Sequence, residues 1–275
     1  MINEILNIVA ESAPEIRLEL STRRDHSTTI NPTGDSQLAV DIWVDNLLSD
    51  RILALDSVGS YASEERSELS ISGDGFSVAV DPLDGSSNLL SNNMMGTIIG
   101  IYDSQLPTSG RDLISAAYVL YGPITTMVVA DSTSVTEYIL GQGKPIPLRE
   151  NITLPNDPKI YGFGGRENEW SPKFHKYAET IKETLKLRYG GALISDINQI
   201  LTYGGIFAYP GTSSSPQGKI RTLFEAHPVA YIIESAGGKS TNGEMSLLDL
   251  EPDDLHSRTP FYAGNASFID SIQNL

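Results

Sequence analysis

Hydrophobic residues recur at helical spacing in two stretches near the start of the chain. The first stretch, residues 2–20, predicts a helix that Pro14 kinks or restarts, with Ser12 available to cap its second part. The polar stretch 21–34 is rich in Ser, Thr and Asp and predicts a mobile loop. Residues 36–55 predict a second helix with one apolar face.

Short apolar runs separated by turn residues then predict a sheet. The predicted strands are residues 58–62, 76–80, 96–102, 113–121, 125–130 and 135–140. Most connections between them are too short for a crossover helix, so we expect antiparallel neighbours. Residues 141–158 are rich in Gly, Pro and Asn and predict a boundary between an N-terminal unit, 1–157, and a C-terminal unit, 158–275.

The C-terminal unit alternates between strand-like and helix-like patterns. Strands are expected at residues 159–163, 206–209, 219–225 and 260–263. Helices are expected at residues 171–185, 193–203 and 228–236, and at the C-terminus behind Ser267 as a cap. Strands and helices in this mixture predict an α/β (α+β) fold.

Composition narrows the possible partners and compartment. The chain has 275 residues and no cysteine. Its formal net charge of −16 argues against nucleic acid or an anionic membrane as partner. No apolar run is long enough to span a membrane, and acids stand near the start where a signal peptide needs bases. We therefore expect a cytoplasmic protein, whose acidity fits adaptation to salt or to cold equally well.

The octapeptide DPLDGSSN, residues 81–88, follows the predicted strand 76–80. Carboxylates at a strand end are hard oxygen ligands of the kind that Mg²⁺ prefers. The Gly-Ser-Ser turn behind them can direct backbone N–H groups and hydroxyls at a phosphate. The octapeptide alone leaves an ordinary Asp-Gly turn open as the alternative.

Further carboxylates are predicted at the ends of two other strands: Glu64, Glu65 and Glu225. Adjacent acids such as Glu64 and Glu65 are commonly solvated surface pairs. If the acids instead converge to about 4 Å, each pair repels by roughly 4 kcal/mol at an effective dielectric constant of about 20. Such a cluster requires bound cations, which predicts a divalent-metal site with more than one ion.

The chain has only 19 Lys and Arg, yet Lys219 and Arg221 alternate on the predicted strand that ends in Glu225. With Arg188 they suit a multiply anionic substrate, and a surface ladder of salt bridges is the alternative. The sequence lacks G-x-S-x-G and P-loop patterns, which argues against a nucleophilic serine and that route of nucleotide hydrolysis. Packing or surface roles are expected for the histidines, which lack metal-binding spacing: His26, His175, His227 and His256.

These motifs resemble a known family. SEE followed by DPLDGSSN is similar to the metal-binding signature of the lithium-sensitive, Mg²⁺-dependent sugar phosphatases. GKIRTLFEAHPVAYIIESAGG, residues 218–238, narrows the resemblance to class I fructose-1,6-bisphosphatase. RYGGALISDINQILTYGGIFAYP (188–210) and NPTGDSQLAVD (31–41) are similar to two further regions of that family.

The resemblance implies a layered α-β-α-β-α sandwich, a homotetramer and several bound Mg²⁺ ions, with Mn²⁺ as a substitute. The implied reaction is hydrolysis of the 1-phosphate of fructose 1,6-bisphosphate in gluconeogenesis, by in-line attack of activated water without a covalent enzyme intermediate. Three residues would activate that water, with Glu65 as general base: Asp35, Asp41 and Glu65.

The resemblance also implies binding roles. The metal ligands would be the carboxylates of Glu64, Glu65, Asp81, Asp84 and Glu225 and the backbone carbonyl of Leu83. The phosphate being cleaved would contact Asp84, Gly85, Ser86, Ser87 and Arg221. The sugar and its 6-phosphate would contact Asn168, Tyr189, Tyr209 and Lys219. Arg188 would reach into the neighbouring subunit's site, which implies at least a dimer.

Departures from the family pattern change some expectations. The chain begins later than the regulated members, and two basic AMP contacts of the family map to Gly75 and Asp103, so we expect weak or absent AMP inhibition. A sugar-site tyrosine of the family maps near Ser171, which leaves sedoheptulose 1,7-bisphosphate as an alternative or second substrate. Lys219 and Arg221 argue against an inositol phosphatase, and the complete ligand set argues against an inactive sugar-phosphate sensor.

Overall fold

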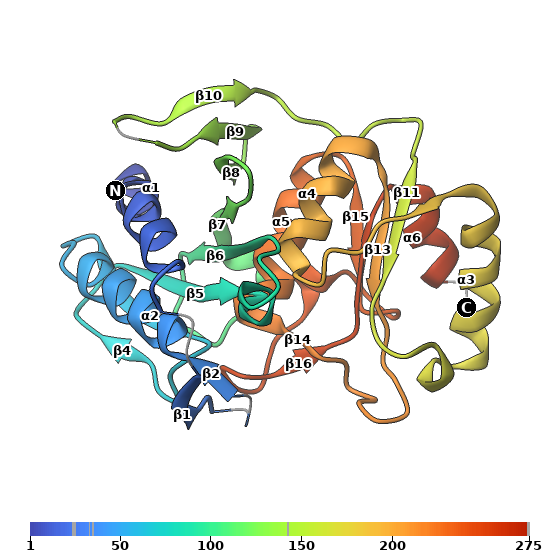
Figure 1. Ribbon diagram of the computed structural model, residues 1–275, viewed down its shortest axis with the longest axis horizontal. Coiled ribbons are helices and arrows are strands. Elements are labelled where there is room, and N and C mark those ends of the chain that lie inside the picture. The colour runs from blue at the N-terminus through green and yellow to red at the C-terminus, as the bar shows by residue number, and fades with distance from the viewer. Residues whose placement is uncertain (24–25, 33, 35, 142, 274–275) are drawn as a thin grey trace.

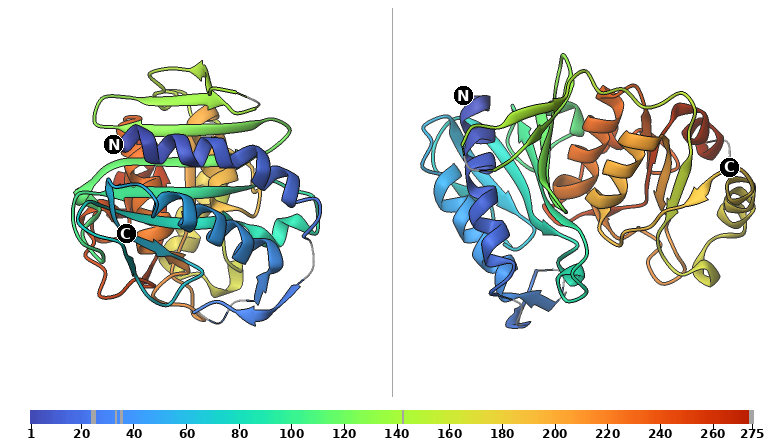
Figure 2. Two further views of the ribbon diagram at one scale, coloured as in Figure 1. Left: turned by 90° about the vertical axis from the view of Figure 1, so that its left-hand side faces the viewer. Right: turned by 45° about the horizontal axis from the view of Figure 1, so that its top comes forward.

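Helices and sheets alternate in five layers, α-β-α-β-α, in the computed structural model of this chain (Figures 1 and 2). The structure describes residues 1–23, 26–32, 34, 36–141 and 143–273, and for 26–30, 36, 37 and 273 it describes the backbone alone. The prediction of an α/β fold, and of the layered sandwich implied by the resemblance, is confirmed.

The larger sheet has eight strands in the order β10-β9-β8-β7-β6-β5-β3-β4. All neighbours are antiparallel except β3 and β5, which run parallel. The strands are β3 (Val58–Ser63), β4 (Ser70–Ile71), β5 (Phe76–Asp84), β6 (Met95–Tyr102), β7 (Leu113–Tyr121), β8 (Thr125–Asp131), β9 (Val135–Ile139) and β10 (Ile146–Arg149).

Both faces of this sheet are buried, because side chains of a strand point alternately to its two sides. Along β7, Ala117 and Val119 belong to a core shared with α1 (Ile2–Glu19) and α2 (Ala39–Ile52). Tyr118 belongs instead to a second core, shared with α4 (Leu193–Tyr203) and α5 (His227–Ser235). The first helix pair therefore covers one face of the sheet and the second pair covers the other.

The smaller sheet lies beyond α4 and α5 and has the order β12-β11-β13-β17-β15. Phe207 of β13 faces the core around α4 and α5, whereas its neighbours Ile206 and Ala208 face α3 (Pro172–Thr184) and α6 (Ala266–Gln273). The five strands are β11 (Ile160–Phe163), β12 (Lys186–Leu187), β13 (Gly205–Tyr209), β15 (Lys239–Thr241) and β17 (Phe261–Gly264).

The N-terminal elements differ from prediction in three places. The expected loop 21–34 contains β1 (His26–Ile30), which pairs with β2 (Ser36–Leu38), so α2 begins at Ala39 rather than at Ser36. The backbone N–H of Leu38 donates to Asp41 Oδ2 (2.7 Å), and this bond fixes the helix start. Ser12 is no cap, because α1 continues through Pro14 and the Ser12 hydroxyl donates to the carbonyl of Ile8 (2.7 Å).

The later elements differ too. The predicted boundary region contains the edge strand β10, and β15 was missed because its three residues carry little pattern. The predicted strand 219–225 ends after β14 (Ile220–Arg221), which pairs with β16 (Arg258–Thr259). A π-helical turn, η4 (Thr222–Ala226), follows it and leads into α5. Ser267 does not cap α6, which already begins at Ala266.

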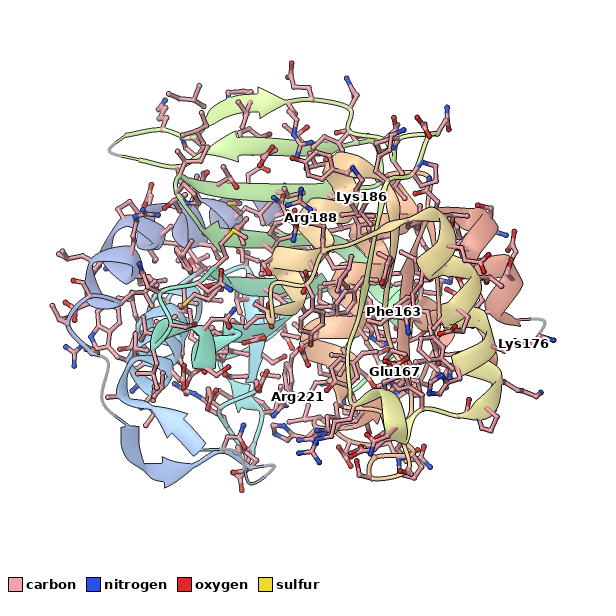
Figure 3. The ribbon with its side chains drawn as sticks, turned by 45° about the vertical axis from the view of Figure 1, so that its right-hand side comes forward. Phe163, Glu167, Lys176, Lys186, Arg188 and Arg221 are labelled. Atoms are coloured by element: carbon pink, nitrogen blue, oxygen red, sulfur yellow. The ribbon has the colours of Figure 1, made fainter. Side chains whose placement is uncertain are left out.

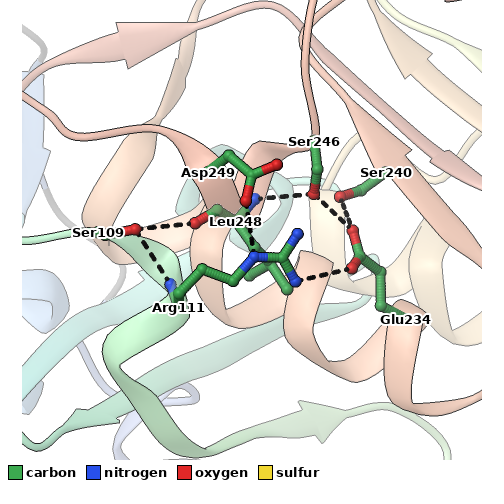
Figure 4. Close-up of polar contacts among 7 residues, drawn as sticks. All are labelled: Ser109, Arg111, Glu234, Ser240, Ser246, Leu248 and Asp249. Carbon is green, nitrogen blue, oxygen red and sulfur yellow. Dashed lines mark hydrogen bonds and ion pairs between the residues drawn. The ribbon is translucent and has the colours of Figure 1, made fainter.

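A polar clasp joins the large sheet to the layer of α5 (Figure 4). Arg111 lies on the short helix η2 (Gly110–Asp112), and its Nε is 2.7 Å from Asp249 Oδ1 on η5 (Leu247–Asp249). Its Nη1 lies 3.6 Å from Glu234 Oε2 at the end of α5. The hydroxyls of Ser240 and Ser246 donate to the other oxygen of Glu234 at 2.7 and 2.9 Å.

Among the described residues, no helix is both long enough and apolar enough to cross a membrane.

Candidate active site

The two acids of the octapeptide lie on a bulge at the end of β5. Asp81 is opposite Ile98 of β6 while Asp84 is opposite Gly96, so two residues of β5 face one of β6. A bulge redirects the side chains beside it. Both carboxylates are buried, and Leu83 is buried between them. The strand thus continues through the acids, whereas the sequence had predicted that it ends at Asp81.

The turn after the acids can only be made by glycine. Gly85 has φ +73°, and a Cβ there would lie 2.2 Å from the Cβ of Ala192. The short helix η1 (Ser86–Leu89) follows, and Asn88 Nδ2 of this helix donates to the carbonyl of Gly190 (2.9 Å). The octapeptide is therefore packed against the segment just before α4.

Asp81, Asp84 and Glu225 form one buried cluster, with one carboxylate oxygen of each lying within 4.8 Å of the other two. Burial, reinforced by neighbouring carboxylates, raises the pKa of Asp81 well above its usual value. Burial and the nearby Glu225 raise the pKa of Asp84 to about 7. These shifts measure how strongly the cluster resists carrying its full negative charge without a cation.

Glu225 reaches the cluster from the π-helical turn η4. The backbone N–H of Arg221 donates to Glu225 Oε2 (2.6 Å), which closes the turn and ends β14. The sequence had placed Glu225 at a strand end, because Ile220 to Phe224 carries residues favoured in strands. The structure brings Glu225 to the same buried point as Asp81 and Asp84, but by a turn and not at a strand end.

Arg221 enters the same cluster. Its side chain is buried, and its Nη1 lies 3.1 Å from Glu64 Oε1 and 4.0 Å from Glu225 Oε2. Burial raises the pKa of Glu64 well above its usual value, and the guanidinium opposes that rise. The alternative of a solvated surface pair is therefore wrong for Glu64.

The N-terminus of α4 holds Asp84, a contact the sequence did not reveal. The backbone N–H groups of Leu193 and Ile194 donate to its two oxygens at 3.2 and 2.7 Å. The positive end of a helix dipole stabilises an anion placed there. Asp196, in the first turn of α4, accepts from the N–H of Gly190 (2.7 Å), and burial raises its pKa to about 6. The pair Gly190-Gly191 indicates a turn before the predicted helix, but it does not indicate Asp84 as the partner of the helix N-terminus.

Asp41 lies beside Glu65 and Ser86. Burial raises the pKa of Asp41 to about 7, the Leu38 N–H and the Ser86 hydroxyl lower it, and the charge of Glu65 raises it. Three predicted residues from α2, from the end of β3 and from η1 thus interact at one place. Asp35 lies outside the described residues.

The predicted sugar-binding residues form a more open region. Tyr189 stacks on Phe207 with ring centroids 6.3 Å apart, and its pKa is raised to about 12 by burial and then by Tyr209 and other nearby groups. Asn168 and Lys219 are exposed. The charge of Lys219 contributes to a lowered pKa of Glu169, after the hydroxyl of Ser214. Ser87 is exposed beside Ser86.

Lys219 and Arg221 have different environments. Only Ile220 and Arg221 belong to β14, and Arg221 is buried against acids while Lys219 faces solvent. Arg188 is exposed on the segment after β12 and lies well away from Arg221 in Figure 3. Arg188 therefore does not join the acidic cluster of its own chain.

The cluster fits hard divalent cations. It offers carboxylate oxygens from Asp81, Asp84 and Glu225, with Glu64 adjacent, and among the described residues it contains no sulfur or imidazole ligand. Such oxygens suit Mg²⁺ and similar ions. Arg221 supplies one positive charge against these buried acids.

A second group of metal-ligating side chains is exposed on α3 and the preceding helix η3 (Glu167–Glu169). Glu167, His175 and Glu179 each have a ligand atom within 4.8 Å of the others. Lys182 Nζ lies 2.6 Å from Glu167 and 3.3 Å from Glu179, so one ammonium already offsets half of the negative charge of these two carboxylates. His175 has the surface role that the sequence predicted.

Two family models match the chain in sequence order. Residues 6–145 match the model described as fructose-1-6-bisphosphatase, N-terminal domain, and residues 154–275 match the C-terminal domain of the same family. Together the two models cover most of the chain.

Similar curated proteins and solved structures agree with the two family models. The chain is 51% identical to fructose-1,6-bisphosphatase class 1 1 of Haloarcula marismortui, over 99% of this chain and 94% of that protein. It is 41% identical to fructose-1,6-bisphosphatase class 1 of Geobacter sulfurreducens, over 86% of this chain and 78% of that protein. The crystal structure of Leishmania major fructose-1,6-bisphosphatase in holo form superposes with a TM-score of 0.94 at 29% identity, covering 99% of this chain and 93% of that one.

Proposed function

Because the chain belongs to the fructose-1,6-bisphosphatase family, we propose that it hydrolyses the 1-phosphate of D-fructose 1,6-bisphosphate to fructose 6-phosphate and phosphate. The family implies dependence on a divalent metal, and we propose Mg²⁺, with more than one ion per subunit and Mn²⁺ as a substitute. The observation that carries the proposal is the convergence of Asp81, Asp84 and Glu225 on one buried point.

The acids Glu64, Glu65, Asp81, Asp84 and Glu225, with the carbonyl of Leu83, would hold the metal. Bound divalent ions supply Lewis acidity and neutralise charge on a phosphoryl group in transfer. The chain itself fixes these carboxylates in advance, since backbone N–H groups of α4 and β14 donate to Asp84 and Glu225. Preorganised charges do not have to reorient during the reaction.

The other residues would orient substrate and move the proton. The Gly85–Ser87 turn directs N–H groups and hydroxyls at the 1-phosphate, and Arg221 offers its guanidinium nearby. Glu65 accepts a proton from the attacking water at its carboxylate, and Asp41, whose pKa responds to Glu65, shares that proton. Asp35 is proposed to assist them. Water attacks phosphorus directly as the bond between phosphorus and the sugar's O1 breaks, and the leaving oxygen takes up a proton, so no enzyme-bound phosphoryl group forms.

Phosphate release tests this proposal directly. Fructose 1,6-bisphosphate is assayed with Mg²⁺ beside sedoheptulose 1,7-bisphosphate and an inositol monophosphate. We expect release from the first substrate, loss of activity after chelation, and recovery with Mg²⁺ along a curve steeper than one-ion saturation. If no phosphate is released from fructose 1,6-bisphosphate with Mg²⁺ present, the proposal is wrong.

Sedoheptulose 1,7-bisphosphate is the second candidate substrate. Asn168, Tyr189, Tyr209 and Lys219 would hold the sugar and its distal phosphate, and Asn168 and Lys219 are exposed. Ser171, near which a sugar-site tyrosine of the family maps, caps α3 by accepting from the N–H of Phe174 (3.1 Å) and brings no ring to the pocket. This smaller side chain favours tolerance of a longer sugar. The ratio of kcat/KM for the two bisphosphates measures that tolerance.

Arg188 is proposed to complete the site of a neighbouring subunit, in a homo-oligomer that we expect to be a tetramer. Its exposure and its distance from Arg221 support this proposal (Figure 3). Arg188→Ala and Glu65→Gln, each inactive alone, should restore part of the activity when mixed oligomers form. In a mixed oligomer, Arg188 of a Glu65→Gln subunit reaches the site of an Arg188→Ala subunit, whose Glu65 is intact. A mixture no more active than its two components contradicts the proposal.

AMP is proposed to be a weak inhibitor or none. Gly75 has φ +150°, and a Cβ there would lie 2.5 Å from the carbonyl oxygen of Ser57, so no basic side chain fits at this position. Asp103 is exposed and would repel a phosphate. Titration with AMP should leave turnover unchanged, and strong inhibition would show that another AMP site exists.

We also propose that the protein acts in the cytoplasm, in gluconeogenesis, and that residues 1–157 and 158–275 are its two sequence units. The family assignment supports the first proposal, and the Gly- and Pro-rich segment 141–158 supports the second.

A further inference from the structure

A buried carboxylate outside the metal cluster anchors the turn that carries Glu65. Asp45 lies on α2, is 4% exposed and accepts a hydrogen bond from Arg66 Nε (2.6 Å). Its other oxygen accepts from the hydroxyl of the fully buried Tyr61 (3.0 Å). Arg66 directly follows Glu65, so its anchored side chain restrains the backbone of the Glu64–Glu65 turn.

The Arg66 side chain is held on several sides. Its guanidinium carbon lies 5.6 Å from the ring centroid of Tyr61, and its Nη2 donates to Asn46 Oδ1 (3.1 Å). Nε2–H of His256 donates to the backbone carbonyl of Arg66 (2.8 Å). The His256 ring packs on Phe224, with centroids 5.4 Å apart, next to Glu225. Both metal-binding turns are thus in contact with this one group of residues.

The spacing along α2 connects this anchor to the proposed chemistry. Asp41 and Asp45 are four residues apart and therefore lie on one face of the helix. Asp41 interacts with Glu65, and Asp45 binds the next residue, Arg66. Asp41 and Asp45, about one helical turn apart on α2, thus interact with the two consecutive residues Glu65 and Arg66.

We propose that Asp45 and Arg66 are positioning residues, which fix the Glu64–Glu65 turn against α2 and so set the distance between Glu65 and Asp41. The inference rests on the proposed function, since it assigns these two residues to the same site. A buried ion pair is weak evidence for stability in itself. This pair matters for the reaction through the position of Glu65, because a displacement of about 1 Å at a reacting group can cost about 100-fold in rate.

A second ion pair on the same helix provides the matched control. Arg51 Nη2 lies 2.6 Å from Glu15 Oε2 and joins α2 to α1. Arg51→Met and Arg66→Met remove the same charge from ion pairs of equal length. Because the Arg51 pair is more exposed, Arg51→Met controls for loss of the charge and of a contact to α2 but not for the buried Asp45 left without its partner. Displacement of Glu65 is expected in Arg66→Met alone.

The experiment measures fructose 1,6-bisphosphate turnover by the full chain with Mg²⁺. Arg66→Met and Asp45→Asn should lower kcat by about 10- to 100-fold while KM changes by less than about twofold. Arg66→Lys should recover part of kcat, and Arg51→Met should retain wild-type kcat. The double variant Asp45→Asn/Arg66→Met should be no slower than the worse single variant, because both changes break one contact.

Equal kcat in Arg66→Met and the wild type, or equal losses in Arg66→Met and Arg51→Met, overturns the inference. Inactivity of the wild type contradicts the proposed function instead. In that case amide hydrogen exchange at Ser63–Arg66 decides the positioning role. It should accelerate at least about tenfold in Arg66→Met relative to Arg51→Met, and no acceleration overturns the inference. If Arg66→Met does not fold, kcat and amide hydrogen exchange are measured on Arg66→Lys and Asp45→Asn instead.

Discussion

The acidic side and the sugar side of the site are built differently. Asp81, Asp84 and Glu225 are buried, and backbone N–H groups fix Asp84 and Glu225 from two other elements. On the sugar side, Asn168 and Lys219 are exposed. Buried charges must be held in place, because they cannot be solvated when they move. The proposed metal site is therefore preorganised, while the proposed sugar-binding surface is open to solvent.

Among these variants, removal of the proposed general base, Glu65, should have the largest effect. Glu65→Gln keeps the size of the side chain and should lower kcat by about 10²–10⁴-fold, the usual range for a general base. Glu68→Gln, an exposed acid on the same loop, should change nothing. Steady-state kinetics with circular dichroism checks both variants, and near-normal turnover of Glu65→Gln would show that another group takes the proton.

The sugar side should respond through KM rather than kcat. If Lys219 binds the distal phosphate as proposed, Lys219→Met removes a charge-assisted hydrogen bond worth about 1.5–3 kcal/mol and should raise KM by about 10- to 100-fold. Lys144→Met, an exposed lysine of the β9–β10 loop, is the matched control and should leave KM unchanged. A fall in kcat without a rise in KM would mean that the two sides are not separate in function.

The smallest expected effect concerns stability. The usual carboxyl pKa of 3.8 rises to about 7 in folded Asp84, through burial and Glu225, and to about 7 in folded Asp41, through burial above all. Such carboxyls stabilise the folded chain fully at a pH below the pKa that they have in the unfolded chain. This contribution is lost as pH rises through the pKa that they have in the folded chain.

Without metal, Tm should therefore fall from about pH 5 to about pH 8, and saturating Mg²⁺ should reduce that fall. Calorimetry with chelator and with Mg²⁺ compares the two slopes. Parallel slopes would indicate that the acidic cluster is not where the ion binds.

Local pattern was sufficient for much of the fold. The predicted strand 113–121 and the predicted helix 193–203 coincide with β7 and α4. Both are long and mostly apolar, and both are largely buried. The strand predicted at 219–225 was wrong beyond Arg221, because Glu225 closes a turn onto the Arg221 N–H, a contact that strand propensity cannot indicate.

The site was predicted in its residue types but not in its supports. Acids, glycine and hydroxyls stand together in DPLDGSSN and could be interpreted chemically. The contacts that hold them join distant parts of the chain: Leu193 and Ile194 to Asp84, and Arg66 to Asp45. Such pairings depend on how the layers stack. A single sequence contains no local signal for that stacking.

The layer of α4 and α5 determines how the chain unfolds. One continuous apolar core contains Tyr118 of the large sheet, Ile197 of α4 and Phe207 of the small sheet, and the Arg111 clasp closes its edge. Neither sheet can lose its partner without exposing that core to water, so separate melting of the two halves is unfavourable. Heating should therefore produce one cooperative transition, with a calorimetric enthalpy equal to the van't Hoff enthalpy. The two sequence units then behave as one thermodynamic body, and an isolated half should aggregate instead of folding.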